Sequence, residues 1–278
     1  MPTVTNAVDT SAVVARLELA RRLAREAGVL TLRYFQSPDL AVDEKSDGSP
    51  VTIADKKSEE LIRAGIQAGF PDDGILGEEF GHSKPKDDAG FTWIVDPIDG
   101  TRSFSRGIPS YAVLIGLEYA GRSVGGVVEL PGMGERLWAH EGGGAFWQTA
   151  RNETAMAARV SATPTLAEAW LEIAQPRQFR RSDRWGAFDR LVMAAGRTQG
   201  WSDADAFALV ATGRVDGAIQ FGVSAWDIAP FDCIMHEAGG LQSDWTGRRT
   251  LDARFVVASN GLIHQELLAI LSPHAGAR

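Results

Sequence analysis

Several carboxylates of the chain stand where an apolar run ends in a tight turn. The stretch TWIVDPIDGTRSF (92–104) places Asp96 and Asp99 three residues apart at the end of such a run, just before a glycine and a threonine. Two carboxylates buried close together repel each other, so we expect a positive group between them. Acids in similar surroundings are Asp55, Glu78, Glu79 and Asp227.

Oxygen ligands of this kind favour Mg²⁺ or Mn²⁺ over zinc or copper, which prefer histidine and cysteine. The five histidines are scattered without ligand spacing, and we interpret each as a surface or capping residue. Gly100 and Thr101 allow backbone N–H groups to approach an anion, and the threonine hydroxyl can orient a water molecule. Metal-holding carboxylates beside such a turn predict a phosphate site, where the metals neutralise the acids and activate water.

Each acid also has a simpler interpretation when it is taken alone. Glu78 and Glu79 fit a solvated loop, as does an Asp-Pro turn. Asp55 lies three residues after Thr52, in the position of a capping-box acid, and Asp227 can cap the helix that follows it. The conjunction of several acids at element ends, with one pair inside DPIDGT, favours a metal site over these separate interpretations.

The composition indicates a soluble globular protein with one large core or two closely packed halves. The chain has 278 residues, of which 44% are hydrophobic and 23% charged, and its formal net charge is −8. This acidity argues against a nucleic-acid or acidic-membrane partner. One cysteine allows no intrachain disulfide, and the chain shows no signal-peptide or membrane-spanning pattern, so we expect a cytoplasmic location.

These residues must be positioned by an ordered set of helices and strands. Apolar residues at helical spacing predict long amphipathic helices over 11–35 and 53–68, on either side of a polar loop. Short apolar runs separated by glycine-bearing turns then predict a mostly antiparallel sheet. The expected strands lie, in order, in ILGEE, TWIVDPID, YAVLIGLEYAG, SVGGVVELP, RLWAHEGGGAFW and AWLEIAQ.

The last third of the chain alternates between helices and strands. The predicted elements are helices over 185–195, 205–212 and 229–238, strands over 217–221 and in FVVAS, and a closing helix in LIHQELLAILS. A helix pair, a sheet and then alternating elements indicate a layered α+β or α/β architecture. We expect two halves, 1–150 with most metal ligands and 151–278 with Asp227 and the substrate-selecting residues, packed as one unit without a linker.

Four segments resemble the signature of the inositol monophosphatase superfamily, in the order of that family. They are KSDGSPVTIADK (45–56), GILGEEFG (74–81), WIVDPIDGTRSF (93–104) and WDIAPFDCIMHEAGG (226–240). The resemblance spans most of the chain. It implies a lithium-sensitive phosphomonoesterase with a layered αβαβα sandwich fold, two to three Mg²⁺ ions per site, for which Mn²⁺ can substitute, and a homodimer.

The resemblance also implies roles for the acids in holding metal. Glu78, Asp96 and the carbonyl oxygen of Ile98 would hold a first, activating metal. A second metal, which stabilises the leaving oxygen, would be held by Asp96, Asp99 and Asp227. Glu78 would contribute to a third, weaker metal as well.

Catalytic and phosphate-binding roles follow from the same resemblance. Glu79 would be an acid of the metal site that supports the ligands. Thr101, backed by Asp55, would orient and deprotonate the attacking water. The backbone N–H groups of Gly100 and Thr101 would hold the phosphate.

Within the superfamily, the chain is most similar to the histidinol-phosphate phosphatases of histidine biosynthesis. The similarity lies in RSF after DPIDGT, where inositol phosphatases typically have TNF, and in GILGEEFG, SAWDIAPFD and SNGLIH (259–264). Asp203 falls where those enzymes have an acid near the cationic end of the substrate, which suits an amino alcohol with an imidazole. Asp99 and Asp227 would also contact substrate. Gln220 stands where a glutamate is usual, and it keeps an acceptor oxygen without the charge.

Other interpretations stay open from the sequence. Asp203 also fits the N-cap of a helix over 204–213. An inositol-1-monophosphatase or a broad sugar-phosphate phosphatase would use the same chemistry. A non-catalytic sensor of phosphorylated ligands is the alternative from a different class. A pure binding protein need not keep a complete water-activating set, which here consists of Glu78, Asp96, Asp99, Thr101 and Asp227.

Overall fold

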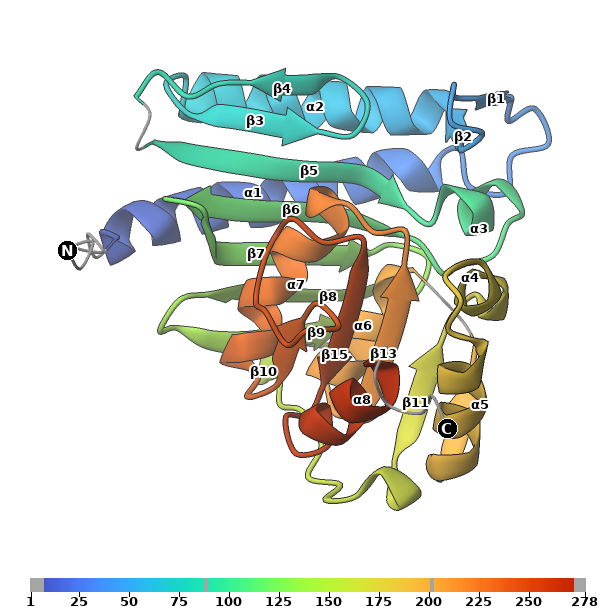
Figure 1. Cartoon of the computed structure of the whole chain (residues 1–278). Helices are drawn as coiled ribbons and strands as arrows, with labels where there is room; N and C mark the ends of the chain where they lie inside the picture. Colours follow the sequence, from blue (N-terminus) through green and yellow to red (C-terminus); the bar gives the residue numbers. More distant parts are fainter. Residues whose placement is uncertain (1–7, 88–89, 201–202, 273–278) are drawn as a thin grey trace.

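The computed structural model describes residues 8–87, 90–200 and 203–272, which form stacked layers of helices and sheets (Figure 1). Two helices cover one face of a large sheet, further helices lie between this sheet and a smaller one, and the remaining helices cover the smaller sheet. The expected αβαβα sandwich is therefore confirmed. Within the described residues, no helix is both long enough and apolar enough to cross a membrane.

The outer layer consists of α1 (Thr10–Leu32) and α2 (Ile53–Gly69), which pack on each other and on the large sheet. In α1 the buried residues recur every three or four positions, from Val13 through Leu17 to Ala27, as helical spacing requires. The sequence pattern places both helices within three residues of their ends. The intervening polar segment, which we expected to be a loop, contains a small hairpin of β1 (Val42–Glu44) and β2 (Pro50–Thr52).

The large sheet has eight strands, and all neighbours are antiparallel except β3 and β5, which run parallel. Its strands in spatial order are β10 (Asn152–Ala157), β9 (Gly144–Thr149), β8 (Glu135–His140), β7 (Arg122–Leu130), β6 (Ala112–Tyr119), β5 (Phe91–Asp99), β3 (Gly74–Gly77) and β4 (Gly81–Ser83). The run RLWAHEGGGAFW therefore forms two strands, β8 and β9. Its glycines allow the turn, because Gly142 and Gly144 have φ of 74° and 79°.

The smaller sheet has five strands and mixed direction. In spatial order they are β12 (Arg197–Gln199), β11 (Trp170–Ile173), β13 (Gly217–Phe221), β15 (Phe255–Ser259) and β14 (Leu241–Ser243). Around it lie the helices α4 (Pro176–Arg181), α5 (Trp185–Ala194), α6 (Ala204–Ala211), α7 (Ala225–Glu237) and α8 (His264–Leu271), and the short helix η1 (Leu166–Glu168). α6 and α7 lie between the two sheets, whereas α5 and α8 cover the outer face of the small sheet.

α7 begins at Ala225, four residues earlier than the sequence pattern predicts. Ser224 and Asp227 form a reciprocal capping box that starts the helix, and Pro230 lies inside it. Proline has no backbone N–H and is disfavoured inside helices, so the sequence pattern predicts a turn in the segment WDIAP. Because the helix starts early, Asp227 lies in its first turn, at the end nearest to the short helix α3 (Thr101–Ser105) and the end of β5.

Candidate functional site

Three carboxylates meet where β5 ends and α7 begins. Asp96 and Asp99 lie in the last four residues of β5, and Asp227 lies in the first turn of α7. Each offers an oxygen within 4.8 Å of the others. The pairing of β5 with β6 is irregular between Asp96 and Asp99, and the N–H of Ile98 donates to the Asp96 carboxylate at 3.0 Å. This irregularity brings both aspartates to the same edge of the strand end.

The electrostatics of this trio favour a bound cation. Burial, followed by the nearby charges of Glu78, Asp99 and Asp227, raises the pKa of Asp96 well above its ordinary value. Burial and the charges of Asp227 and Asp203 likewise raise the pKa of Asp99, and burial raises that of Asp227 to about 6. A divalent cation removes this repulsion, and an all-oxygen donor set fits a hard metal ion. The trio could therefore hold a metal ion.

Glu78 and Glu79 flank the trio from β3. Because β3 runs parallel to β5, with Gly77 opposite Val95, the residue after β3 lies beside the carboxyl end of β5. The ammonium of Lys45, from the β1–β2 turn, donates to Glu78 at 2.8 Å and to Glu79 at 2.6 Å. Burial raises the pKa of Glu79, and although burial alone lowers the pKa of Lys45, its two carboxylate partners raise it overall.

Asp55 connects the start of α2 with Thr101. One of its carboxylate oxygens accepts from the N–H and hydroxyl of Thr52, which is the capping box expected from the sequence. The other oxygen lies 3.1 Å from the Thr101 hydroxyl, which also lies 3.0 Å from the carbonyl of Ile98. Since a hydroxyl has one proton, it donates to one of these acceptors at a time. Asp55 is fully buried, and burial raises its pKa.

Gly100 forms the turn between β5 and α3 and has to be a glycine. Its φ is 86°, and a Cβ atom there would lie 2.8 Å from the carbonyl oxygen of Ser110 and 3.2 Å from the Asp203 carboxylate. The close approach brings Asp203 next to the turn that follows the carboxylates. The sequence identified this turn by its composition, without showing what it packs against.

Asp203 and Gln220 lie on the same side of the site but in different roles. Asp203 is the N-cap residue of α6, yet its side chain makes no capping hydrogen bond; Ser103 donates to its carboxylate at 3.2 Å. The amide nitrogen of Gln220, on β13, donates to the main-chain carbonyl of Asp203 at 2.7 Å. Gln220 is 7% exposed and does not line the cleft. The structure therefore places it behind Asp203, as a support for its backbone, and not beside it.

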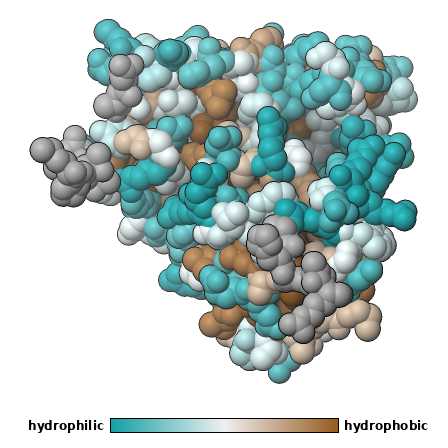
Figure 2. Space-filling model, viewed as in Figure 1, coloured by the Kyte–Doolittle hydropathy of each residue, from teal (hydrophilic) through white to brown (hydrophobic). Residues whose placement is uncertain are grey.

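All these elements open into one cleft with a volume of about 740 Å³. Its lining includes Glu78, Asp96, Ile98, Asp99, Gly100, Thr101, Asp203 and Asp227. Asp55, Glu79 and Gln220 lie outside that lining. The cleft has a further wall that the sequence did not predict, formed by α4 with Arg177 and Arg181. Charges on a short helix are usual on a solvated surface, so no sequence signal marked them; Figure 2 shows a strongly hydrophilic patch where α4 lies in Figure 1.

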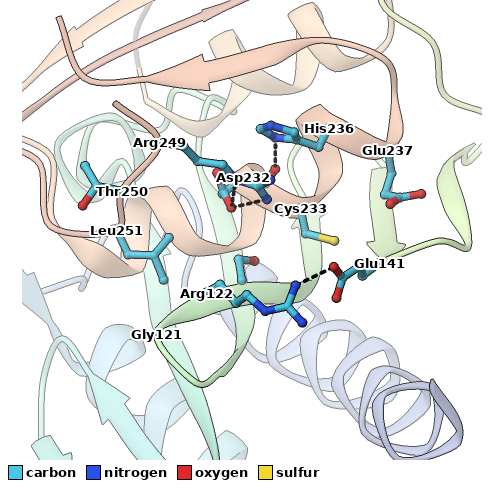
Figure 3. A pocket seen from close by; sticks show the side chains of 11 residues that line it. Gly121, Arg122, Glu141, Asp232, Cys233, His236, Glu237, Arg249, Thr250 and Leu251 are labelled. Atoms are coloured by element: carbon cyan, nitrogen blue, oxygen red, sulfur yellow. Dashed lines mark hydrogen bonds and ion pairs between the residues drawn. The ribbon is translucent and has the colours of Figure 1, made fainter. Parts of the chain in front are cut away.

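A second, smaller cavity of about 380 Å³ shares no lining residue with this cleft (Figure 3). Two ion pairs lie in its wall, Arg249 with Asp232 at 2.8 Å and Arg122 with Glu141 at 2.6 Å. Burial raises the pKa of the Cys233 thiol, which keeps it protonated and unreactive. We therefore place the chemistry in the larger cleft.

Comparison with known proteins agrees with this geometry. The family model described as "Inositol monophosphatase family" matches residues 14–275. The chain belongs to the inositol monophosphatase family. The proteins similar to it carry the names of phosphatases for different substrates. A histidinol-phosphatase of Chlorobaculum parvum is 40% identical over 92% of this chain and 96% of the relative. An inositol-1-monophosphatase of Mesorhizobium japonicum is 37% identical over 96% of both chains.

A solved structure shares the fold of this chain. The extragenic suppressor protein suhB of Bartonella henselae superposes with a TM-score of 0.84 at 29% identity, over 94% of this chain and 99% of the other. This inositol monophosphatase-family protein is thus related over nearly its whole length to phosphatases with different names. Membership in the family establishes the class of phosphatases, while the substrate has to be argued from the cleft.

Proposed function

We propose that this protein is a Mg²⁺-dependent phosphomonoesterase and that its substrate is histidinol phosphate, which it hydrolyses to histidinol and phosphate. The observation that supports the phosphatase activity is the Asp96–Asp99–Asp227 trio beside the Gly100–Thr101 turn, at the floor of one cleft. Glu78 and the Ile98 carbonyl complete an all-oxygen set, which fits two or three Mg²⁺ ions, with Mn²⁺ as a substitute. When bound, these ions supply charge neutralisation and activate water for attack on the phosphoryl group.

Thr101 and Asp55 are the groups that handle the proton of the attacking water. The Thr101 hydroxyl donates to Asp55, so its oxygen can accept a proton from water while its own proton passes to the Asp55 carboxylate. Because burial raises the pKa of Asp55, this carboxylate is a better proton acceptor than an exposed aspartate. Its other oxygen is fixed by Thr52, so the acceptor oxygen keeps its direction.

The phosphate is held, in this proposal, by the backbone N–H groups of Gly100 and Thr101. The absence of a side chain at Gly100 and its positive φ let the backbone approach an anion closely. Asp99 and Asp227 lie next to this turn and would contact the ester through the bound ions. Glu79 supports the arrangement through Lys45, which it shares with Glu78.

Asp203 is the group that selects the substrate. Its carboxylate lines the cleft next to Gly100, and an ammonium group on the alcohol part of the ester would pair with it there. The 40% identity to a histidinol-phosphatase over most of both chains supports this choice. Gln220 contributes by holding the Asp203 backbone with its amide nitrogen, and its amide oxygen is the acceptor that we expect for substrate.

The second candidate is an inositol-1-monophosphatase, favoured by the 37% identity to a relative of that name. Inositol phosphate has no cation for Asp203, so the two candidates differ in their use of this one carboxylate. The substrates of a broad sugar-phosphate phosphatase would likewise have no cation for Asp203. A non-catalytic sensor is the least supported, because the cleft combines the acidic trio with the Thr101–Asp55 contact.

A parallel assay of phosphate release tests the proposal. L-Histidinol phosphate, inositol 1-phosphate and a nucleoside 3′,5′-bisphosphate are compared at equal concentration, with Mg²⁺ and with a chelator. We expect Mg²⁺-dependent release with the highest kcat/KM on histidinol phosphate. Fast hydrolysis of inositol 1-phosphate with none of histidinol phosphate would overturn the substrate, whereas no release from any ester would overturn the activity.

A further inference from the structure

The outer wall of the cleft carries a group of arginines that the proposed reaction does not use. Arg177 and Arg181 are four residues apart in α4, so they lie on one face of the helix, and both line the cleft. Arg102, in α3, lines it as well. The carboxylates gather at the floor of this cleft, while the guanidinium groups gather at its rim.

The guanidinium groups of the two α4 arginines are not held by an acid in the part of the chain that the structure describes. Among residues 8–87, 90–200 and 203–272, neither Arg177 nor Arg181 has an acidic partner within ion-pair distance. Both are exposed, and the strongly hydrophilic patch in Figure 2 covers this helix. Arg102 donates to the carbonyl of Gly48 at 3.3 Å and keeps its remaining N–H donors. Guanidinium groups with free donors recognise phosphate and carboxylate groups.

We propose that Arg177 and Arg181, with Arg102, form a subsite for a second anionic group of the substrate. The cleft would then accept phosphomonoesters that carry a further phosphate or carboxylate, in addition to the phosphate cleaved at the floor. The proposal rests on the proposed function in one respect, since the cleaved phosphate defines which end of the substrate reaches the rim. It extends the substrate range beyond histidinol phosphate, which has no second anion.

Opposite charges on two sides of the cleft then sort the substrates. Asp203 attracts a cationic group near the floor, and the α4 arginines attract an anionic group near the rim. The protein carries a net charge of −8, so attraction by the molecule as a whole does not explain why an anion would reach this cleft. Arginine donors at the rim act at contact distance, where salt screens them less than it screens distant charges.

The test uses two esters that differ in one group. Glycerol 3-phosphate and 3-phosphoglycerate share the same phosphate ester, and only the second has a carboxylate at the far carbon. Fructose 6-phosphate and fructose 1,6-bisphosphate form the corresponding pair for a second phosphate. We measure kcat/KM on both pairs with Mg²⁺ at about 0.15 M salt, where separated charges beyond about 8 Å are screened.

The Arg177→Gln/Arg181→Gln double variant should lower the ratio of kcat/KM within a pair by about tenfold, because it removes charge-assisted hydrogen bonds to the second anion. The carboxylate pair and the phosphate pair show separately which anion the rim binds. Arg180→Gln is the control from the same helix: it removes one positive charge there, but Arg180 lies against the ring of Trp185 and does not line the cleft. It should leave both ratios unchanged.

An unchanged ratio in the double variant for both pairs would overturn the subsite. This outcome includes an equal loss on both members of each pair, since the arginines would then act only on the phosphate that all esters share. If no ester releases phosphate, the proposed phosphatase activity fails on its own. The rim is then judged by titration calorimetry of 3-phosphoglycerate against glycerol 3-phosphate, with the same contrast expected between the double variant and Arg180→Gln.

Discussion

Asp96 is a buried carboxylate whose pKa is raised by burial and by the charges of Glu78, Asp99 and Asp227, so its ionised form needs a bound cation. Replacing it by asparagine keeps the shape of the side chain and removes a ligand charge. We expect Asp96→Asn to reduce phosphate release by at least about a hundredfold, the scale of losing one electrostatic contributor to transition-state stabilisation. Turnover under saturating Mg²⁺ is the measurement, with circular dichroism as the control for folding.

The same variant separates metal chemistry from packing. Because the substitution relieves repulsion in the metal-free protein, its fold should be retained and its melting temperature without Mg²⁺ should not fall. Turnover close to that of the unmodified protein would contradict the proposed role of Asp96 in holding metal.

Asp203 is the residue on which the substrate assignment depends. We expect Asp203→Asn to lower kcat/KM on histidinol phosphate by about ten- to a hundredfold, since a hydrogen bond to a charged group contributes about 1.5–3 kcal/mol. An aryl phosphate without a cation should be affected little. The two substrates are compared on the same preparation of the variant.

Asp47→Asn is a suitable control for Asp203→Asn, because Asp47 also lines the cleft but forms its hydrogen bonds with Ser49. It should not discriminate between the two substrates. Equal losses on both substrates in Asp203→Asn would assign Asp203 to the structure of the α6 start instead.

At the scale of elements, the first turn of α2 serves both the fold and the site. Thr52→Ala removes the cap and should lower the free energy of unfolding by about 0.5–2 kcal/mol, while the contact between Asp55 and Thr101 remains. Asp55→Asn should in addition reduce turnover by about 10²–10⁴-fold, the contribution of a positioned base. Urea unfolding and turnover are measured on both variants.

The comparison of these two variants decides between the two interpretations of Asp55. A large loss of turnover in Asp55→Asn beside a small one in Thr52→Ala supports a direct part in the reaction. Similar losses of turnover and stability in both would show that Asp55 acts only as a helix cap.

The sequence predicted elements well where a strong local signal exists. Thr52 and Asp55 correctly predicted the start of α2, and the acids of DPIDGT correctly predicted the end of β5. The start of α7 was predicted four residues late. Pro230 is typical of a turn, although the helix already begins at the Ser224–Asp227 capping box. α4 was missed altogether, since six residues with exposed arginines carry no apolar periodicity.

At the scale of the molecule, the layered architecture followed from the order of helices and strands, but the pairing of strands did not. β3 and β5 are parallel neighbours that bring Glu78 beside Asp96, and no local pattern specifies that pairing. Likewise, Gln220 and Asp203 are 17 residues apart in the sequence, and the contact between the Gln220 side chain and the Asp203 backbone depends on how α6 and β13 pack. Residue types indicated which side chains do chemistry, and tertiary packing decided which of them reach the cleft.

The buried acids also make a prediction about stability and pH. The folded-state pKa is raised to about 6 for Asp227 and, mainly through burial, to about 7 for Asp205, whereas the ordinary value is 3.8. Folding therefore favours the protonated forms: their contribution is fully present below about pH 4 and is lost as pH rises through 6 to 7. The metal-free protein should melt at progressively lower temperature from about pH 4 to about pH 7, and these two groups should add no further loss above that range.

Mg²⁺ should reverse this loss, because an ion bound only to the folded state stabilises it by about 2.7 kcal/mol at a hundred times its Kd. Melting curves in chelator and in millimolar Mg²⁺ are recorded across the same pH range, and the difference should widen as pH rises and the ligands deprotonate. Curves that coincide at about pH 7 would show that these acids do not form a metal site.

The Lys45 ammonium lies between Glu78 and Glu79 and is attached to the turn of the β1–β2 hairpin. It therefore already compensates part of the negative charge of the site. A metal ion that bound the same Glu78 oxygen would displace this contact, so its apparent affinity would be the difference between the two contacts. Because coupling is reciprocal, binding of the ion would weaken the contact of the hairpin with Glu78 by the same factor by which that contact weakens ion binding. A contact that pulls the hairpin outward therefore tightens ion binding, and one that holds it inward weakens it.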